Sequence, residues 1–69
     1  MKRYIGYEVR AFALTIEPDG KPVYKPARDE DADLFCVYGR VGILSWEWIE
    51  DVPNRKFGEA RIRQFMSAS

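Results

Sequence analysis

A chain of 69 residues has room for one small domain, residues 1–69, and a domain of this size buries only about 60% of the surface that its unfolded form exposes. Its eleven basic and eleven acidic side chains cancel, which disfavours a generally basic nucleic-acid binder, while a single cysteine and no histidine exclude an internal disulfide and leave no plausible zinc site. Self-association is the remaining route to extra stability, so a homodimer is one expectation.

Residues 4–16 are β-branched, aromatic or small and contain no proline, which predicts one long strand. The apolar side chains occupy odd positions up to Ala11 and even positions from Phe12 onward. A β-bulge or strong twist near Arg10 to Phe12 would reconcile the two halves, because one inserted residue turns every later side chain to the opposite face. Gly6 is a second candidate for the kink.

Residues 17–20, with the sequence EPDG, predict a tight turn, because proline fixes φ at the second position and glycine supplies a positive φ. A short return strand is expected around residues 23–25, between Pro22 and Pro26. Two prolines at equal parity remove N–H donors from the same side of a strand. This strand is therefore expected to form a protected edge of the sheet.

A charged loop, residues 27–33, comes next. The aspartates that alternate from Asp29 resemble the start of a calcium loop, but Leu34 stands where that loop requires glycine, so we reject a calcium site. We expect a solvated connection between two hairpins, with Glu30 and Asp31 among its exposed carboxylates.

Residues 34–41 are apolar at both parities, which is typical of a central strand that is covered on both sides. A reversal bounded by glycines follows. Residues 43–50 then predict the return strand, with Leu44, Trp46 and Trp48 on one side of it.

A single helix is expected at the C-terminal end, with Asn54 as its N-cap and Asp51 placed to favour the positive end of the helix dipole. Gly58 weakens this helix. The apolar stripe expected to pack on the sheet consists of Phe57, Ile62, Phe65 and Met66.

The elements predict an α+β fold, a single antiparallel sheet of about four strands built from two β-hairpins, with one C-terminal helix packed on one face. A helix of about four turns is roughly 20 Å long and covers only one side of such a sheet. The sequence nevertheless supplies apolar side chains for both sides. The strands must either curl to bury both faces or leave one aromatic face exposed, and exposed apolar patches usually mark interfaces.

The aromatic residues of the second hairpin form the candidate protein interface. We expect Trp46 and Trp48 to pack under the helix, in which case alanine at either position would cost about 3–5 kcal/mol of unfolding free energy. The alternative is that one of them, together with Tyr38, anchors a protein partner or a second subunit. Arg40 beside the turn is the first charged residue to test, although an exposed turn arginine is the simpler interpretation.

The residue types that catalysis requires are largely absent. Without histidine the common general base is missing, and Cys36 has no partner that would activate it as a nucleophile, so we interpret it as a core residue. No glycine-rich phosphate loop is present either. We expect a protein that is not an enzyme and has no catalytic, cofactor-binding or metal-binding residues.

Charge is distributed unevenly along the chain, and this bears on the partner. Residues 29–51 carry seven acidic and one basic side chain, a net charge of −6 that includes Asp29, Glu30 and Asp31, while each flanking segment carries +3. An acidic surface of this kind attracts basic proteins. Small inhibitors of nucleic-acid-binding proteins present carboxylates to their targets in this way. We therefore expect a protein-binding accessory or inhibitor protein whose target the sequence does not identify.

A single-stranded nucleic-acid-binding module is the alternative function. Bases would stack on aromatic side chains of the sheet, and the helix would supply the phosphate contacts. The candidate phosphate contacts are Arg55, Lys56, Arg61 and Arg63.

No apolar run approaches the roughly 18 residues of a membrane span, and Lys2-Arg3 is not followed by the apolar core of a signal peptide. We expect a cytoplasmic protein that has no membrane partner.

Two segments, Val37-Tyr38-Gly39-Arg40 and Trp48-Ile49-Glu50-Asp51-Val52 followed by a helix, carry a resemblance to known proteins. Together with Tyr7-Glu8-Val9-Arg10 and Pro22-Val23-Tyr24, they resemble short uncharacterised bacterial proteins encoded on plasmids and other mobile elements. The resemblance covers about two-thirds of the chain and implies a bacterial accessory protein. It implies no reaction and no functional residues.

Overall fold

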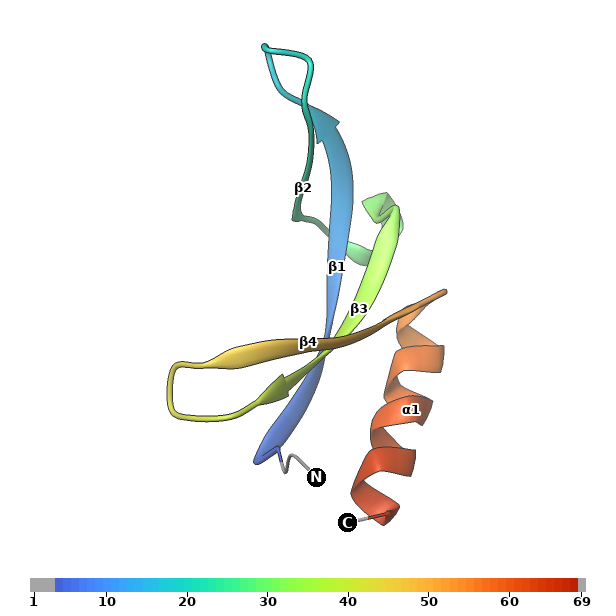
Figure 1. Ribbon diagram of the computed structural model, residues 1–69. Coiled ribbons are helices and arrows are strands. Elements are labelled where there is room, and N and C mark those ends of the chain that lie inside the picture. Colours follow the sequence, from blue (N-terminus) through green and yellow to red (C-terminus); the bar gives the residue numbers. More distant parts are fainter. Residues whose placement is uncertain (1–3, 69) are drawn as a thin grey trace.

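The computed structural model describes residues 4–68 and confirms the α+β fold. One antiparallel sheet has the strand order β2-β1-β3-β4, and a C-terminal helix packs on one of its faces (Figure 1). The elements are β1 (Gly6–Ile16), β2 (Pro22–Pro26), a 3₁₀ helix (Asp29–Asp31), β3 (Leu34–Arg40), β4 (Trp46–Val52) and α1 (Arg55–Ser67).

The first hairpin, β1–β2, has the predicted turn. The Gly20 N–H donates to the Glu17 carbonyl at 2.8 Å, and Gly20 has a φ of +87°, where an L side chain would be strained. Strand β2 pairs only with β1, so the predicted edge strand is confirmed. The Ala27 N–H donates to the Ala11 carbonyl of β1, so the backbone polar groups of odd-numbered residues in this segment point toward β1. The backbone groups of the even-numbered Pro22 and Pro26 therefore point away from the sheet, at its outer edge.

The expected bulge in β1 is wrong, as is the kink at Gly6, because β1 pairs in continuous register with both neighbouring strands. The irregularity lies in β4. Val37 of β3 is paired with Glu50 and Tyr38 with Trp48, which leaves Ile49 as an extra residue. This bulge turns all the following side chains of β4 to the opposite face.

Strand β4 also lies further along the chain than residues 43–50. Residues 43–45 belong to the β3–β4 turn, so Leu44 is not a strand residue. Glycine at position 42 and the hydrogen bond from the Val41 N–H to the Ser45 carbonyl, at 2.9 Å, close this turn.

Helix α1 covers the face of the sheet on which Val9, Val37 and Val52 are buried. Its point of closest approach is Gly58. A Cβ atom there would lie 2.7 Å from a methyl carbon of Val9 and 3.2 Å from one of Val52. The predicted N-cap is confirmed, since the Asn54 side chain accepts the Phe57 N–H at 2.7 Å.

Only part of the predicted apolar stripe of α1 packs on the sheet. Phe65 stacks on Tyr7 of β1, with 5.6 Å between ring centroids, and Ile62 is half-buried. Phe57 and Met66 are largely exposed, so their assignment to the packed side is wrong. The packed side is centred on Gly58 and supplies little apolar surface of its own.

The helix covers only the first part of β1, and the β1–β2 hairpin extends well beyond it (Figure 1). The molecule is correspondingly elongated, with extents of 44 × 24 × 17 Å. The change of apolar parity in β1 follows from this shape. Val9 and Ala11 face the helix, whereas Phe12, Leu14 and Ile16 belong to the opposite face of the sheet.

Candidate interaction surface

Trp46, Trp48 and Tyr38 come together on the side of the sheet opposite the helix. The register pairs Tyr38 with Trp48 and Arg40 with Trp46, whereas Val52, beyond the bulge, is buried against the helix side. The expectation that both tryptophans lie under the helix is therefore wrong, and the bulge is the physical reason. Trp48 is 57% exposed.

We define the open face as the side chains that the register places on this side. It extends from the β3–β4 hairpin to the outer end of β1–β2. Its members are Glu8, Arg10, Phe12, Leu14, Ile16, Pro22, Tyr24, Pro26, Leu34, Cys36, Tyr38, Arg40, Trp46, Trp48 and Asp51.

Arg10 lies at the centre of the open face. Its guanidinium carbon is 4.4 Å from the centroid of the Tyr38 ring and 5.1 Å from that of Trp46, and its Nε donates to Glu8. Such cation–π contacts contribute about 0.5–1 kcal/mol each at exposed sites. Arg10 is not among the site residues predicted from the sequence. One feature of the sequence could have identified it: Arg10 is a charged residue in an apolar strand, and it lies two positions before Phe12, so both side chains are on the same face.

Trp48 is held by Asp51. The Asp51 carboxylate accepts the indole N–H at 2.9 Å and the Cys36 thiol at 3.3 Å, both at one oxygen. These bonds orient the ring while more than half of it stays exposed. Asp51 therefore belongs to the open face, on the side of the sheet opposite the helix.

Burial raises the pKa of the Cys36 thiol to about 11, and the adjacent Asp51 carboxylate adds to the rise. The thiol is therefore protonated at neutral pH. In the unfolded chain its pKa is about 8.5, so the stabilisation from the neutral thiol is complete below that pH and is lost as the pH rises towards 11.

We predict that the free energies of unfolding of wild type and Cys36→Ala differ by a constant amount below about pH 8.5 and that this difference shrinks between pH 8.5 and 11. Urea denaturation across this range measures it, and the tyrosines and lysines that both proteins share cancel in the difference. Two curves that run parallel up to pH 11 would contradict the prediction.

The outer hairpin continues the apolar surface. Phe12 lies next to Tyr38, with 6.3 Å between ring centroids, and beyond it Leu14 pairs with Tyr24 across β1 and β2. Leu14 is 44% and Tyr24 52% exposed, although both are large and apolar in character. Within the described residues, no element of the chain covers this surface.

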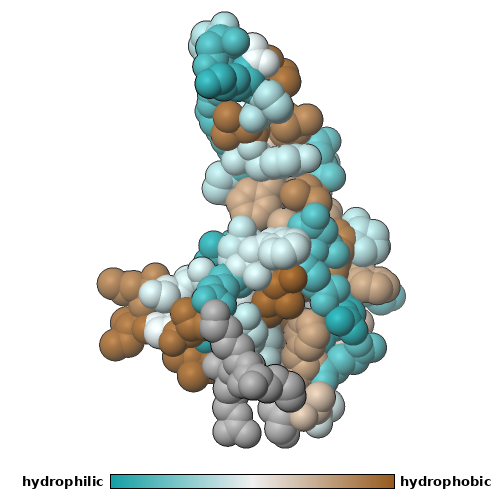
Figure 2. All heavy atoms as spheres, viewed as in Figure 1, coloured by the Kyte–Doolittle hydropathy of each residue, from teal (hydrophilic) through white to brown (hydrophobic). Residues whose placement is uncertain are grey.

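Arg40 has a defined structural role. It donates through Nε to the Gly42 carbonyl at 2.9 Å and through a terminal nitrogen to the Ile43 carbonyl at 3.0 Å, so it holds the β3–β4 turn. The turn presents apolar side chains to solvent: Leu44 is 91% exposed, and Ile43 is nearly as open. Figure 2 shows this turn as a hydrophobic projection at the left of the molecule.

Of the predicted acidic contacts, Asp29 is joined to the helix. Both oxygens of Asp29 accept from Arg55, at 2.5 and 3.0 Å, and Arg55 also donates to the Val9 carbonyl at 3.1 Å. The hydrogen bonds from Arg55 hold the pKa of Asp29 below its usual range. Asp29 thus fastens the start of α1 to the sheet, while Glu30 and Asp31 are exposed.

The basic residues of the helix are divided between two roles. Arg55 is paired with Asp29, and Arg61 donates to Glu50 at 2.9 Å while lying over the Phe65 ring. Lys56 and Arg63 are exposed. Because α1 and the open face lie on opposite sides of the sheet, the structure does not bring the basic candidates together with the exposed aromatic rings.

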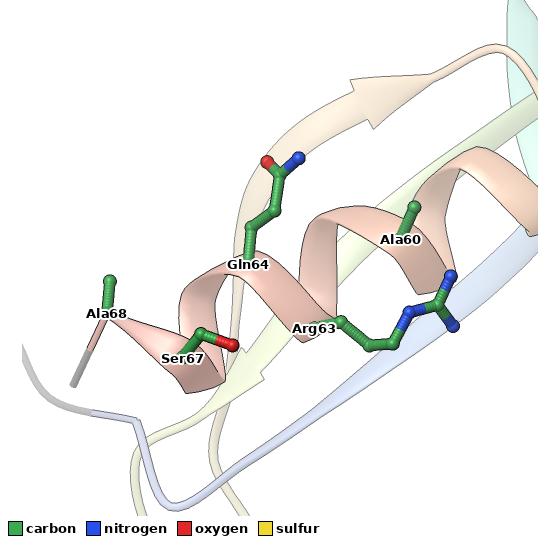
Figure 3. A pocket seen from close by; sticks show the side chains of 5 residues that line it. All are labelled: Ala60, Arg63, Gln64, Ser67 and Ala68. Carbon is green, nitrogen blue, oxygen red and sulfur yellow. The ribbon is translucent and has the colours of Figure 1, made fainter.

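A shallow hollow lies on α1 near the end of the helix (Figure 3). Arg63 is the only charged side chain among its lining residues, which are Ala60, Arg63, Gln64, Ser67 and Ala68. In residues 4–68, no cluster of histidine, cysteine or carboxylate side chains has the arrangement of a metal site. No helix in that range is long and apolar enough to span a membrane.

Comparison with known proteins gave no matching family model, no similar curated protein and no similar solved structure.

Proposed function

We propose that this protein is a non-enzymatic, cytoplasmic accessory protein that binds another protein chain through its open face. The observation that carries this proposal is the exposed aromatic surface centred on Arg10, with Trp48 oriented but largely uncovered. Tryptophan, tyrosine and arginine are the residues that dominate the energetics of protein interfaces. The resemblance to short bacterial proteins encoded on plasmids and other mobile elements supports an accessory role.

The internal pairing of the charges on the open face supports a protein partner. Arg10 is paired with Glu8, and the Asp51 carboxylate accepts hydrogen bonds from Trp48 and Cys36. A protein can therefore cover Arg10 and Glu8 without leaving either charge unpaired, which would otherwise cost several kcal/mol, while Asp51 keeps the two hydrogen bonds that it accepts. A partner rich in phosphates would instead require free cations.

Photo-crosslinking tests the proposal. A benzophenone amino acid placed at Tyr24 on the open face is expected to form crosslinks to protein, whereas the same group at Phe57 is the matched control, because Phe57 is also aromatic and is 49% exposed on the helix. Crosslinking at Tyr24 that does not exceed that at Phe57 would contradict the proposal.

The nucleic-acid alternative is tested with single-stranded oligonucleotides and tryptophan fluorescence, since base stacking on Trp46 or Trp48 would quench their emission. Affinity that falls steeply with added salt would favour this alternative, because phosphate contacts release counterions. Under our proposal, oligonucleotides leave the emission unchanged at all salt concentrations.

A further inference from the structure

We propose that the chain covering the open face is a second copy of this protein, in a dimer with twofold symmetry. This inference rests on the proposed function and identifies the partner at the same surface. Three observations carry it: the amount of surface left exposed, the small size of the core, and the charge balance of the open face.

The isolated chain exposes more surface than a folded protein of its mass. Its accessible surface is 5218 Å², whereas the scaling for folded monomers gives about 4,500 Å² at 8.1 kDa. The excess of roughly 700 Å² is close to the approximately 800 Å² that each partner buries in a standard interface. The radius of gyration, 13.5 Å against about 11 Å for a compact chain of this length, indicates the same elongated, partly uncovered shape.

The core formed by one copy is small. Among residues 4–68, the buried apolar side chains are small or medium-sized, and Val37 is the one that is fully buried. Several large apolar side chains that could enlarge this core, namely Phe12, Tyr38, Trp46 and Trp48, lie instead on the open face. A partner that completes the core should be present whenever the chain folds, and the partner that meets this requirement without exception is another copy of the chain.

The open face is also complementary to itself in charge. It carries two cations, Arg10 and Arg40, and two anions, Glu8 and Asp51, so its net charge is zero. Arg40 is occupied by the carbonyl groups of its own turn. Two such faces can meet without repulsion between like charges, whereas a strongly basic or acidic partner would find no complementary field.

A twofold axis through this face would pack two sheets against each other, as in a β-sandwich, with a shared apolar layer about 10 Å thick between them. The helix would then lie on the outside of each sheet. Because a twofold contact uses the same surface of both chains, it closes after two subunits.

Sedimentation equilibrium of the purified protein tests this inference. From about 1 to 200 μM we expect the mass to rise with concentration from 8.1 kDa to twice that value. Leu14→Glu places one carboxylate of each copy in the interface and is expected to weaken association about 100-fold or more. Phe57→Glu, on the outer surface of the helix, is the matched control and should leave the dissociation constant within about twofold of wild type.

Acrylamide quenching of wild-type tryptophan fluorescence, measured at both ends of the concentration range, provides a readout that does not depend on a variant. Trp48 should become protected as the mass increases. A mass of 8.1 kDa at every concentration, or a dimer that Phe57→Glu dissociates and Leu14→Glu does not, would overturn the inference. In either case crosslinks from Tyr24 to a different protein would leave the proposed function standing, whereas the absence of any crosslink would refute both.

Discussion

Gly58→Leu is expected to destabilise the protein by about 3 kcal/mol or more, even though leucine is the better helix former by nearly 1 kcal/mol. A Cβ at this position would already be 2.7 Å from a methyl group of Val9, and Val9 is a buried, β-branched residue with a restricted choice of rotamers. A domain of this length has a total stability of about 3–10 kcal/mol, so the variant should lose about a third of it or more.

Urea denaturation followed by circular dichroism measures this effect. Ala60→Leu is the control, because Ala60 lies two residues further along the helix and borders the open hollow of Figure 3. It should change the free energy of unfolding by no more than about 0.5 kcal/mol. If Gly58→Leu were as stable as Ala60→Leu, the close packing of the helix on Val9 would be wrong.

The second large effect is a contrast between a small buried residue and a large exposed one. Val37→Ala should lower the free energy of unfolding by about 2–3 kcal/mol, because Val37 is fully buried under the helix and the substitution leaves a cavity. Trp48→Ala should lower it by less than about 1 kcal/mol, although the indole is far larger, since 57% of it is already in water.

Thermal and urea denaturation at protein concentrations near 1 μM, where self-association contributes little, are the appropriate measurements. A loss of about 1 kcal/mol corresponds to roughly 4–8 °C in Tm for a domain of this size, so the two variants are readily distinguished. A larger loss for Trp48→Ala than for Val37→Ala would show that the tryptophan belongs to the core.

Composition and pattern predicted the fold class, the first turn, the edge strand and the helix cap, because each depends on local chemistry at named residues. The proline and glycine of residues 17–20 and the amide of Asn54 act within a few residues of their own position. Such short-range determinants can be recognised in the sequence without knowledge of the rest of the fold.

The face that the helix covers could not be predicted, because it depends on one residue. Ile49 is the extra residue in β4, and nothing in its local sequence distinguishes a bulge there from a regular strand. In a regular strand Trp48 and Val52 would share a face. The bulge separates them, and with them the core from the exposed aromatic surface.

The importance of Gly58 was also hidden, because a glycine within a helix is first interpreted as a weak point. In the folded chain it is the point at which the helix can come close to the sheet. The ion pairs of Arg55 with Asp29 and of Arg61 with Glu50 join residues distant in sequence. The position of a residue along a helix does not indicate such pairs. Two of the four predicted basic residues, Arg55 and Arg61, are therefore held in ion pairs within the chain.

The two prolines of β2 limit how this protein can assemble. Growth of a sheet from chain to chain requires two receptive edges on each subunit, one to accept the next strand and one to offer itself. Pro22 and Pro26 stand at outward positions and lack the N–H groups that an incoming strand would need. Of the two edge strands, β4 is therefore the one that can accept another strand. A contact between two β4 strands ends after two chains, so the hairpin that extends the open face also disfavours fibre growth through the sheet edges.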